Sequence, residues 1–132
     1  MHGFEKLSGV LEMTVNTEGN LIVASGGAAD PHLFRLDPAS GEVRGLSEIN
    51  GAVRYPAISP DGKHLAFSRR ESGSWHLYVH DLVGSAEQQL TSAACNATSP
   101  SWEDSESLLY VSDCGRTLGL SAPVRTALKF AP

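Results

Sequence analysis

The stretch "ISPDGKHLAFS", residues 58–68, decides the fold. Its centre, Pro60-Asp61-Gly62, has the chemistry of a four-residue β-turn. Proline presets φ for the first corner position, aspartate caps the turn with its side chain, and glycine accepts a positive φ. The "HLAFS" that follows is a short, largely apolar run typical of a strand. The stretch therefore predicts a tight turn that leads directly into a β-strand.

The same pattern recurs about every 44 residues. "NTEGNLIVAS" (16–25) aligns with "SPDGKHLAFS" (59–68), and "HLFRLD" (32–37) aligns with "HLYVHD" (76–81). A third copy follows, in which "SPSWE" (99–103) aligns with "YPAIS" (55–59). Agreement at one spacing over several segments indicates an internal repeat, and the 58–68 turn is one element of it.

Each repeat contains four strand-like pieces, which in the middle copy read "VRYPAIS", "KHLAFS", "WHLYVHD" and "AEQQLT". No stretch carries a helical apolar stripe over three turns. Four short antiparallel strands every 40 to 45 residues are typical of a β-propeller blade. The sequence predicts an all-β chain of about three four-stranded antiparallel blades, half of a six-bladed ring. The expected blades are approximately 9–48, 49–92 and 93–130. Residues 4–9 are expected to form a detached closing fourth strand, and 124–130 a competing one.

The middle copy, "YPAISPDGKHLAFSRRESGSWHLYVHDLVGSAEQQLT" (55–91), resembles the TolB-like, WD-repeat-like β-propeller repeat. The resemblance covers roughly residues 9–120. The first copy has "NTEG" in place of "SPDG", and the third has "WEDSES" without glycine. The resemblance implies a bacterial propeller that acts as a binding platform. TolB-like propellers are periplasmic and bind protein partners, whereas similar propellers gate the hydrolase domain of prolyl-oligopeptidase-type enzymes.

Composition narrows the function classes. The 132 residues carry a net charge of −5, and the ten basic residues are scattered, which disfavours nucleic acid as a partner. No apolar run approaches the ~18 residues of a membrane-spanning helix, and the N-terminus has no apolar signal-peptide core. The compartment stays unknown from the residues, although the resemblance favours the periplasm. Two alternatives stay open: the chain is a complete protein, or it is a fragment of a longer one.

Recognition is expected where loops meet on one rim of the blades. By the repeat alignment, this rim gathers the loops 26–32, 47–55, 69–74, 92–99 and 113–117. The candidate binding residues there are Arg54, Tyr55, Arg69, Arg70, Glu71, Asp113 and Arg116. A solvated rim without a function is the alternative interpretation.

No catalytic, cofactor or metal site is predicted. The chain lacks G-x-S-x-G, and the expected channel strands offer Glu12 as their one acidic residue. His76 and His80 lie ~13 Å apart on an extended strand, too far to share one ion.

The two cysteines form a candidate disulfide. If Trp102 pairs with Ser107 in the last hairpin, Cys95 and Cys114 lie directly opposite each other near its open end, within bridging range. Two reduced thiols are the alternative. Asp37 and Asp81 are expected to cap the turns that follow them.

The sequence thus favours a non-enzymatic binding or scaffold module for protein or peptide partners. The alternative is a substrate-gating propeller fragment of a larger prolyl-oligopeptidase-like hydrolase, and an enzyme using a channel acid or a metal ranks third. Three blades cannot close a ring, since propellers have about four to eight. We expect two copies to form a six-bladed homodimer, with an open half-ring as the alternative.

Overall fold

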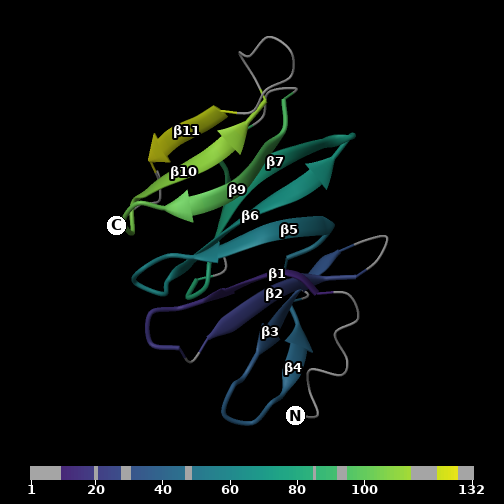
Figure 1. The fold of residues 1–132 in the computed structure, drawn as a ribbon, viewed down its shortest axis with the longest axis vertical. Helices are drawn as coiled ribbons and strands as arrows, with labels where there is room; N and C mark the ends of the chain where they lie inside the picture. Colours follow the sequence, from purple (N-terminus) through teal and green to yellow (C-terminus); the bar gives the residue numbers. More distant parts are fainter. Residues whose placement is uncertain are drawn as a thin grey trace.

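A computed structural model describes residues 10–19, 21–27, 31–46, 49–84, 86–91, 95–113 and 122–127. These residues form eleven strands in three separate antiparallel sheets, and no helix occurs among them (Figure 1). The sheets follow one another along the chain, and each is a meander of sequential neighbours. This confirms the all-β prediction and its division into successive blades.

Blade 1 has the order β1-β2-β3-β4, with bounds Val10–Val15, Ile22–Gly26, His32–Leu36 and Val43–Gly45. Blade 2 has the order β5-β6-β7-β8, with bounds Ala52–Ile58, His64–Glu71, Ser74–Asp81 and Glu87–Gln89. Blade 3 consists of β9-β10-β11, with bounds Ala97–Trp102, Ser107–Ser112 and Ala122–Ala127. The four strands expected in the middle copy correspond to β5–β8.

The turn between β5 and β6 has the predicted chemistry. The backbone N–H of Gly62 donates to the carbonyl of Ser59 at 2.9 Å, and Gly62 has φ = 74°. Asp61 Oδ1 accepts the hydroxyl of Ser59 at 2.6 Å and the N–H of Lys63 at 3.0 Å. Asp61 and Gly62 therefore have their expected roles in reversing the chain.

Two aspartates cap turns as predicted. Asp37 Oδ1 accepts the N–H of Ala39, and Asp81 Oδ1 accepts the N–H of Val83, each at 2.9 Å. These local bonds lower the pKa of both carboxyls. The recurrence of the residue at the end of each third strand thus reflects turn geometry.

Blade 2 is buried on both faces because it lies between the other two. Its first face packs against blade 1 through a core that contains Val23, Leu33, Val53, Leu65 and Phe67. Its second face packs against blade 3 through a core that contains Ala66, Leu77, Val79, Ala97 and Leu108. Successive strand residues point to opposite faces, so alternate residues of one strand enter different cores.

Equivalent hydrogen bonds join both pairs of blades. Ser25 Oγ donates to the carbonyl of Val53 at 2.8 Å, and Ser68 Oγ donates to the carbonyl of Ala97 at 2.8 Å. Both serines are fully buried. The sequence repeat is therefore accompanied by a repeated polar contact between blades.

The first strands of blades 2 and 3 each contain a bulge before a proline. Tyr55 and Ser99 adopt positive φ values of 59° and 55°, next to Pro56 and Pro100. The pairing register of each strand shifts at this point. The extra residue re-aims the start of the strand, a common feature next to binding sites.

This bulge corrects the predicted register of the last hairpin. Trp102 pairs with Leu108, so the predicted pairing with Ser107 is wrong by one residue at the tip. Beyond the bulge, Ser112 pairs with Ala97, which is the register that the prediction assumed at the open end. The one-residue error at the tip is therefore cancelled by the one-residue register shift at the bulge.

The C-terminal strand also differs from expectation. Residues 124–130 are predicted as a competing fourth strand, but β11 pairs with β10 along its whole length, from Ser107–Ala127 to Ser112–Ala122. It therefore occupies the third-strand position of blade 3. Residues 4–9, the expected closing strand, lie outside the described residues.

Candidate functional site

The predicted rim residues come from strand ends that the sheet brings together. Arg54 pairs with Ser68, and Ala52 pairs with Arg70, so the start of β5 lies beside the end of β6. Arg70 in turn pairs with Trp75 at the start of β7. The bulge of β5 and the β6–β7 turn therefore share one end of blade 2.

An ion pair fixes the bulge against blade 1. Arg54 donates from Nε to Glu12 Oε2 at 3.2 Å and from Nη2 to the same oxygen. Glu12 Oε1 accepts the backbone N–H of Tyr55 at 2.8 Å. The hydrogen bonds to Glu12 raise the pKa of Arg54, so the guanidinium stays charged. Glu12 thus holds Tyr55 in its positive-φ conformation from the neighbouring blade.

Two aromatic rings lie in contact at this end of the blade, and each ring has a guanidinium group beside it. The Arg54 guanidinium lies 4.6 Å from the ring centroid of Tyr55. Tyr55 meets Trp75 edge-on, with centroids 6.3 Å apart and planes at 74°. Arg70 lies over Trp75 at 5.6 Å. We call Glu12, Arg54, Tyr55, Arg70 and Trp75 the rim cluster.

The rim cluster continues into blade 3. Asn96 Oδ1 accepts the N–H of Trp75 at 2.9 Å. Asp113 accepts both the backbone and the side-chain N–H of Asn96, at 2.7 and 2.9 Å, and these bonds lower the pKa of its carboxyl. Cys95, which directly precedes Asn96, is disulfide-bonded. Its predicted partner Cys114 lies outside the described residues, as does the rim candidate Arg116.

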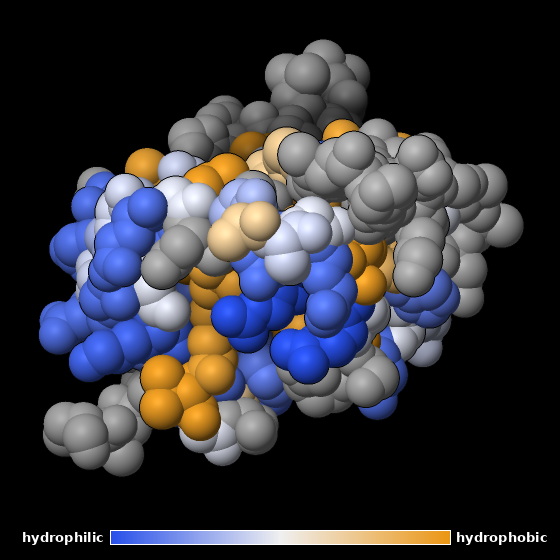
Figure 2. Space-filling model, turned by 90° about the horizontal axis from the view of Figure 1, so that it is seen from below, coloured by the Kyte–Doolittle hydropathy of each residue, from blue (hydrophilic) through white to orange (hydrophobic). Residues whose placement is uncertain are grey.

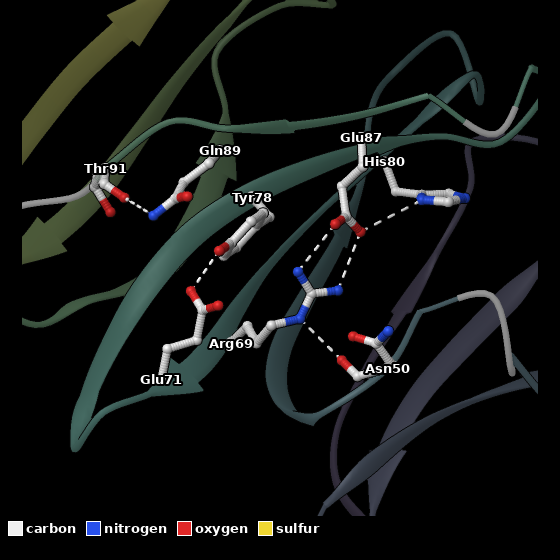
Figure 3. Close-up of polar contacts among 8 residues, drawn as sticks. All are labelled: Asn50, Arg69, Glu71, Tyr78, His80, Glu87, Gln89 and Thr91. Atoms are coloured by element: carbon white, nitrogen blue, oxygen red, sulfur yellow. Dashed lines mark hydrogen bonds and ion pairs between the residues drawn. The ribbon is translucent and has the colours of Figure 1, made fainter.

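Arg69 does not lie at the rim. Arg69 is only 7% exposed, whereas Arg70 is exposed to solvent. Successive side chains of β6 point to opposite faces of the sheet, and the side chain of Arg69 points toward blade 1. Its guanidinium donates to both oxygens of Glu87, at 2.9 and 3.0 Å, and to the carbonyl of Asn50 at 2.8 Å (Figure 3). The expectation of a loop residue available to a partner does not hold for this arginine.

The buried arginine also shapes its surroundings. It lies 4.4 Å from the ring centroid of Tyr78, whose hydroxyl donates to Glu71, another rim candidate (Figure 3). Burial and the bond to Glu71 raise the pKa of Tyr78. Burial alone would raise the pKa of Glu87, but the hydrogen bonds and charge of Arg69 outweigh it and lower that pKa. These contacts hold β6, β7 and β8 together.

The sequence prediction missed two residues of this site: Trp75, which belongs to the rim cluster, and Asn96, which accepts the N–H of Trp75. Trp75 carried a signal, since it begins a strand directly after the polar "RRESGS" loop. Asn96 carried none, because its role depends on the distance between two blades. Among the residues that the structure describes, no group of three His, Cys, Asp or Glu is placed to hold a metal ion. The same residues include no helix able to cross a membrane.

Comparison with protein families decides the kind of fold. The family model of the TolB beta propeller domain matches residues 21–117. This chain belongs to that family. The expectation drawn from the middle repeat is therefore confirmed for the family and the fold. The comparison with curated proteins found no match.

Solved structures place this TolB-family chain among several propellers. TolB from Acinetobacter baumannii superposes with a TM-score of 0.73 at 19% identity, covering 92% of this chain and 31% of that one. A puromycin-hydrolyzing peptidase of Mycobacterium tuberculosis gives 0.64 at 20% identity, covering 90% and 22%. The β-propeller domain of the Trilobed protease from Pyrococcus furiosus gives 0.60 at 23%, covering 80% and 34%. The chain spans about a third or less of each, and the likeness is one of fold.

Proposed function

We propose that this chain is a non-enzymatic binding module that holds an extended protein or peptide segment at the rim cluster. The observation that carries the proposal is a pair of contacting rings, Tyr55 and Trp75, flanked by Arg54 and Arg70 on neighbouring strands. Aromatic and arginine side chains are enriched at the centres of protein interfaces. A rigid sheet holds them here, which lowers the entropy lost on binding.

The geometry favours a particular partner chemistry. Tyr55 and Trp75 meet nearly at right angles and present apolar ring surface that is half-buried. Such surface fits a proline or aromatic side chain of a peptide. The exposed guanidinium of Arg70 lies over Trp75 and places a positive charge beside this ring surface, which attracts a carboxylate. We infer a peptide with an apolar ring followed by an acidic residue.

Selection from a displayed random peptide library tests this proposal. Peptides that bind the chain are expected to lose at least about tenfold in affinity on Trp75→Ala and on Arg70→Ala. Arg44→Ala, a matched arginine change in β4 of blade 1, should leave affinity within about twofold. Selected peptides that bind Trp75→Ala and Arg70→Ala as well as the unchanged chain would contradict the proposal.

The peptidase structures favour a second candidate, a propeller that gates substrate entry to a hydrolase domain. Two of the three structures above carry a peptidase or protease name. This candidate requires a Ser-Asp-His hydrolase domain in the same polypeptide. Reading the complete gene distinguishes it from the first, because a gene that encodes propeller repeats without such a domain excludes gating.

We further propose that two copies close a six-bladed ring, so that the module is a homodimeric scaffold. Met13 and Val15 alternate with Glu12 and Thr14, which contact β5, and so lie on the other face of β1, 52% and 49% exposed. Figure 2 views the molecule from the blade 1 end of Figure 1 and shows hydrophobic surface between hydrophilic groups. Light scattering should give twice 14.0 kDa; a folded monomer would contradict closure.

A further inference from the structure

A pocket of about 330 Å³ lies between blades 1 and 2, away from the rim cluster. Its apolar lining comes from both blades and includes Val23, Leu46 and Leu82. Its polar lining consists of Arg35 on β3 and of His80 and Asp81 on β7. We call this the interblade pocket. A cavity of this size accepts a small organic molecule or one protein side chain.

His80 is the unusual member of this lining. The residue is 5% exposed, and its Nδ1 makes no hydrogen bond. Nδ1 faces Glu87 Oε1 at 3.6 Å, whereas Figure 3 shows the other ring nitrogen directed away from Glu87. Nδ1 thus has Glu87 as its ion-pair partner, and the second ring nitrogen is the atom through which His80, a lining residue of the pocket, can contact a ligand.

The pocket lining carries one guanidinium and one carboxylate, and the carboxylate is directed to the backbone of its own turn. Arg35 contributes a guanidinium, while the carboxylate of Asp81 already accepts the N–H of Val83 and caps its turn. Glu87 is neutralised by Arg69, and it lies on the Nδ1 side of His80. When His80 is protonated, Glu87 stabilises the imidazolium and leaves the second N–H available as a donor.

We propose that the interblade pocket binds a carboxylate, with Arg35 and His80 as its recognising residues. A flat carboxylate matches the guanidinium fork of Arg35 and accepts a further bond from the imidazolium of His80. The apolar walls suit a short aliphatic chain. The carboxylate belongs either to a free dicarboxylic acid or to an acidic residue of a peptide. This site does not depend on the function proposed for the rim cluster.

Nuclear magnetic resonance tests the proposal with defined probes. The histidine ring signals are followed while succinate, an N-acetyl-glutamyl peptide or inorganic phosphate is added at constant ionic strength. A His80 shift with succinate or with the peptide supports the carboxylate site and identifies its source. A response to phosphate alone, or none at all, would overturn it.

The chain offers a matched control. Arg35 and Arg44 lie directly opposite each other on β3 and β4, but only Arg35 lines the interblade pocket. Arg35→Gln should weaken binding of the responding probe about tenfold, the effect of losing one charge-assisted bond. Arg44→Gln should leave it within about twofold. Equal weakening by both would show a diffuse charge effect and refute the site. Trp75→Ala should leave this binding unchanged, which separates it from the rim cluster.

A pH series adds an independent readout. The charged groups around His80 are Glu87 on β8, Arg69 on β6, the adjacent Asp81, and Arg35 across the pocket. Because an imidazolium donates a stronger, charge-assisted bond to a carboxylate than a neutral imidazole does, affinity should increase as the pH is lowered. His80→Gln should abolish this dependence. A pH profile that survives His80→Gln unchanged would contradict the assigned role.

Discussion

Replacing Arg69 with methionine removes a buried cation while keeping an unbranched side chain of similar length. Arg69 makes three hydrogen bonds, two to Glu87 and one to the carbonyl of Asn50. It also lies over the Tyr78 ring. The variant therefore leaves Glu87 and the Asn50 carbonyl without their donors. We expect it to be strongly destabilised.

The burial of each partner sets the magnitude. The Arg69 side chain is 8% exposed and that of Glu87 is 30% exposed. Breaking a buried pair by removing one partner costs about 3–5 kcal/mol. Water can reach Glu87 in part, which places the expected loss at about 2–3 kcal/mol. For a domain of this size the loss corresponds to a decrease in Tm of about 10 °C.

Denaturant unfolding of Arg69→Met, Glu87→Gln and the double variant measures the coupling. The double variant should be about as stable as the worse single one, with a coupling of about 1.5 kcal/mol or more. Arg70→Met, the exposed neighbour, should change stability by about 0.5 kcal/mol or less. Additive losses, with a coupling below about 0.5 kcal/mol, would refute the assignment of Arg69 and Glu87 as a buried pair.

Acid provides a second test of the same pair. The pKa of Glu87 in the folded chain is lower than its ordinary value of 4.5, since Arg69 outweighs the effect of burial. The pair therefore stabilises the fold fully above pH 4.5, and this stabilisation is lost as pH falls through the folded-state pKa. The stability difference between the unchanged chain and Glu87→Gln should shrink over that range. A constant difference would contradict the ion pair.

Three other predictions concern a turn, a contact between blades and the two cysteines. Gly62→Val should lower the free energy of unfolding by about 1–2 kcal/mol. The cause is backbone strain alone, because φ is positive at this position and an added Cβ would meet no atom within 4 Å. Gly62→Asn, measured in the same thermal melt, should retain most of the stability. Ser68→Ala should lose about 1–3 kcal/mol in denaturant unfolding, since the carbonyl of Ala97 loses its buried donor, and an unchanged midpoint would reject that bond. Because Cys95 is disulfide-bonded and Cys114 is the other cysteine of the chain, thiol titration of the unfolded, unreduced chain should find no reactive group, and two reactive thiols would contradict the bridge.

The repeat made most of the fold predictable. Turn residues such as Pro60, Asp61 and Gly62 act through their own backbone, so their roles can be read locally. The strands of blade 2 followed from apolar runs between these turns. The third strand of blade 3 did not, because β11 lies at Ala122–Ala127, beyond a segment longer than the corresponding loop of blade 2. Strand pairing at that distance depends on tertiary contacts.

The sequence predicted where the site lies in the blade better than it predicted which residues form it. Repeat alignment brought Arg54, Tyr55 and Arg70 to one end of a blade because loops of equivalent position meet there. Arg69 was misplaced because its burial depends on Glu87, a partner on another strand. The support that Glu12 gives to Tyr55 crosses between blades, and no spacing within one repeat reports such a contact.

The central claim is that the rim cluster is the binding surface of this propeller. The direct measurement is the map of backbone amide shifts on adding a selected peptide to the isotope-labelled chain. We predict the largest changes at Arg54, Tyr55, Arg70 and Trp75, with little change along β4. Changes centred on β3 and β4, with an unchanged rim cluster, would contradict this claim.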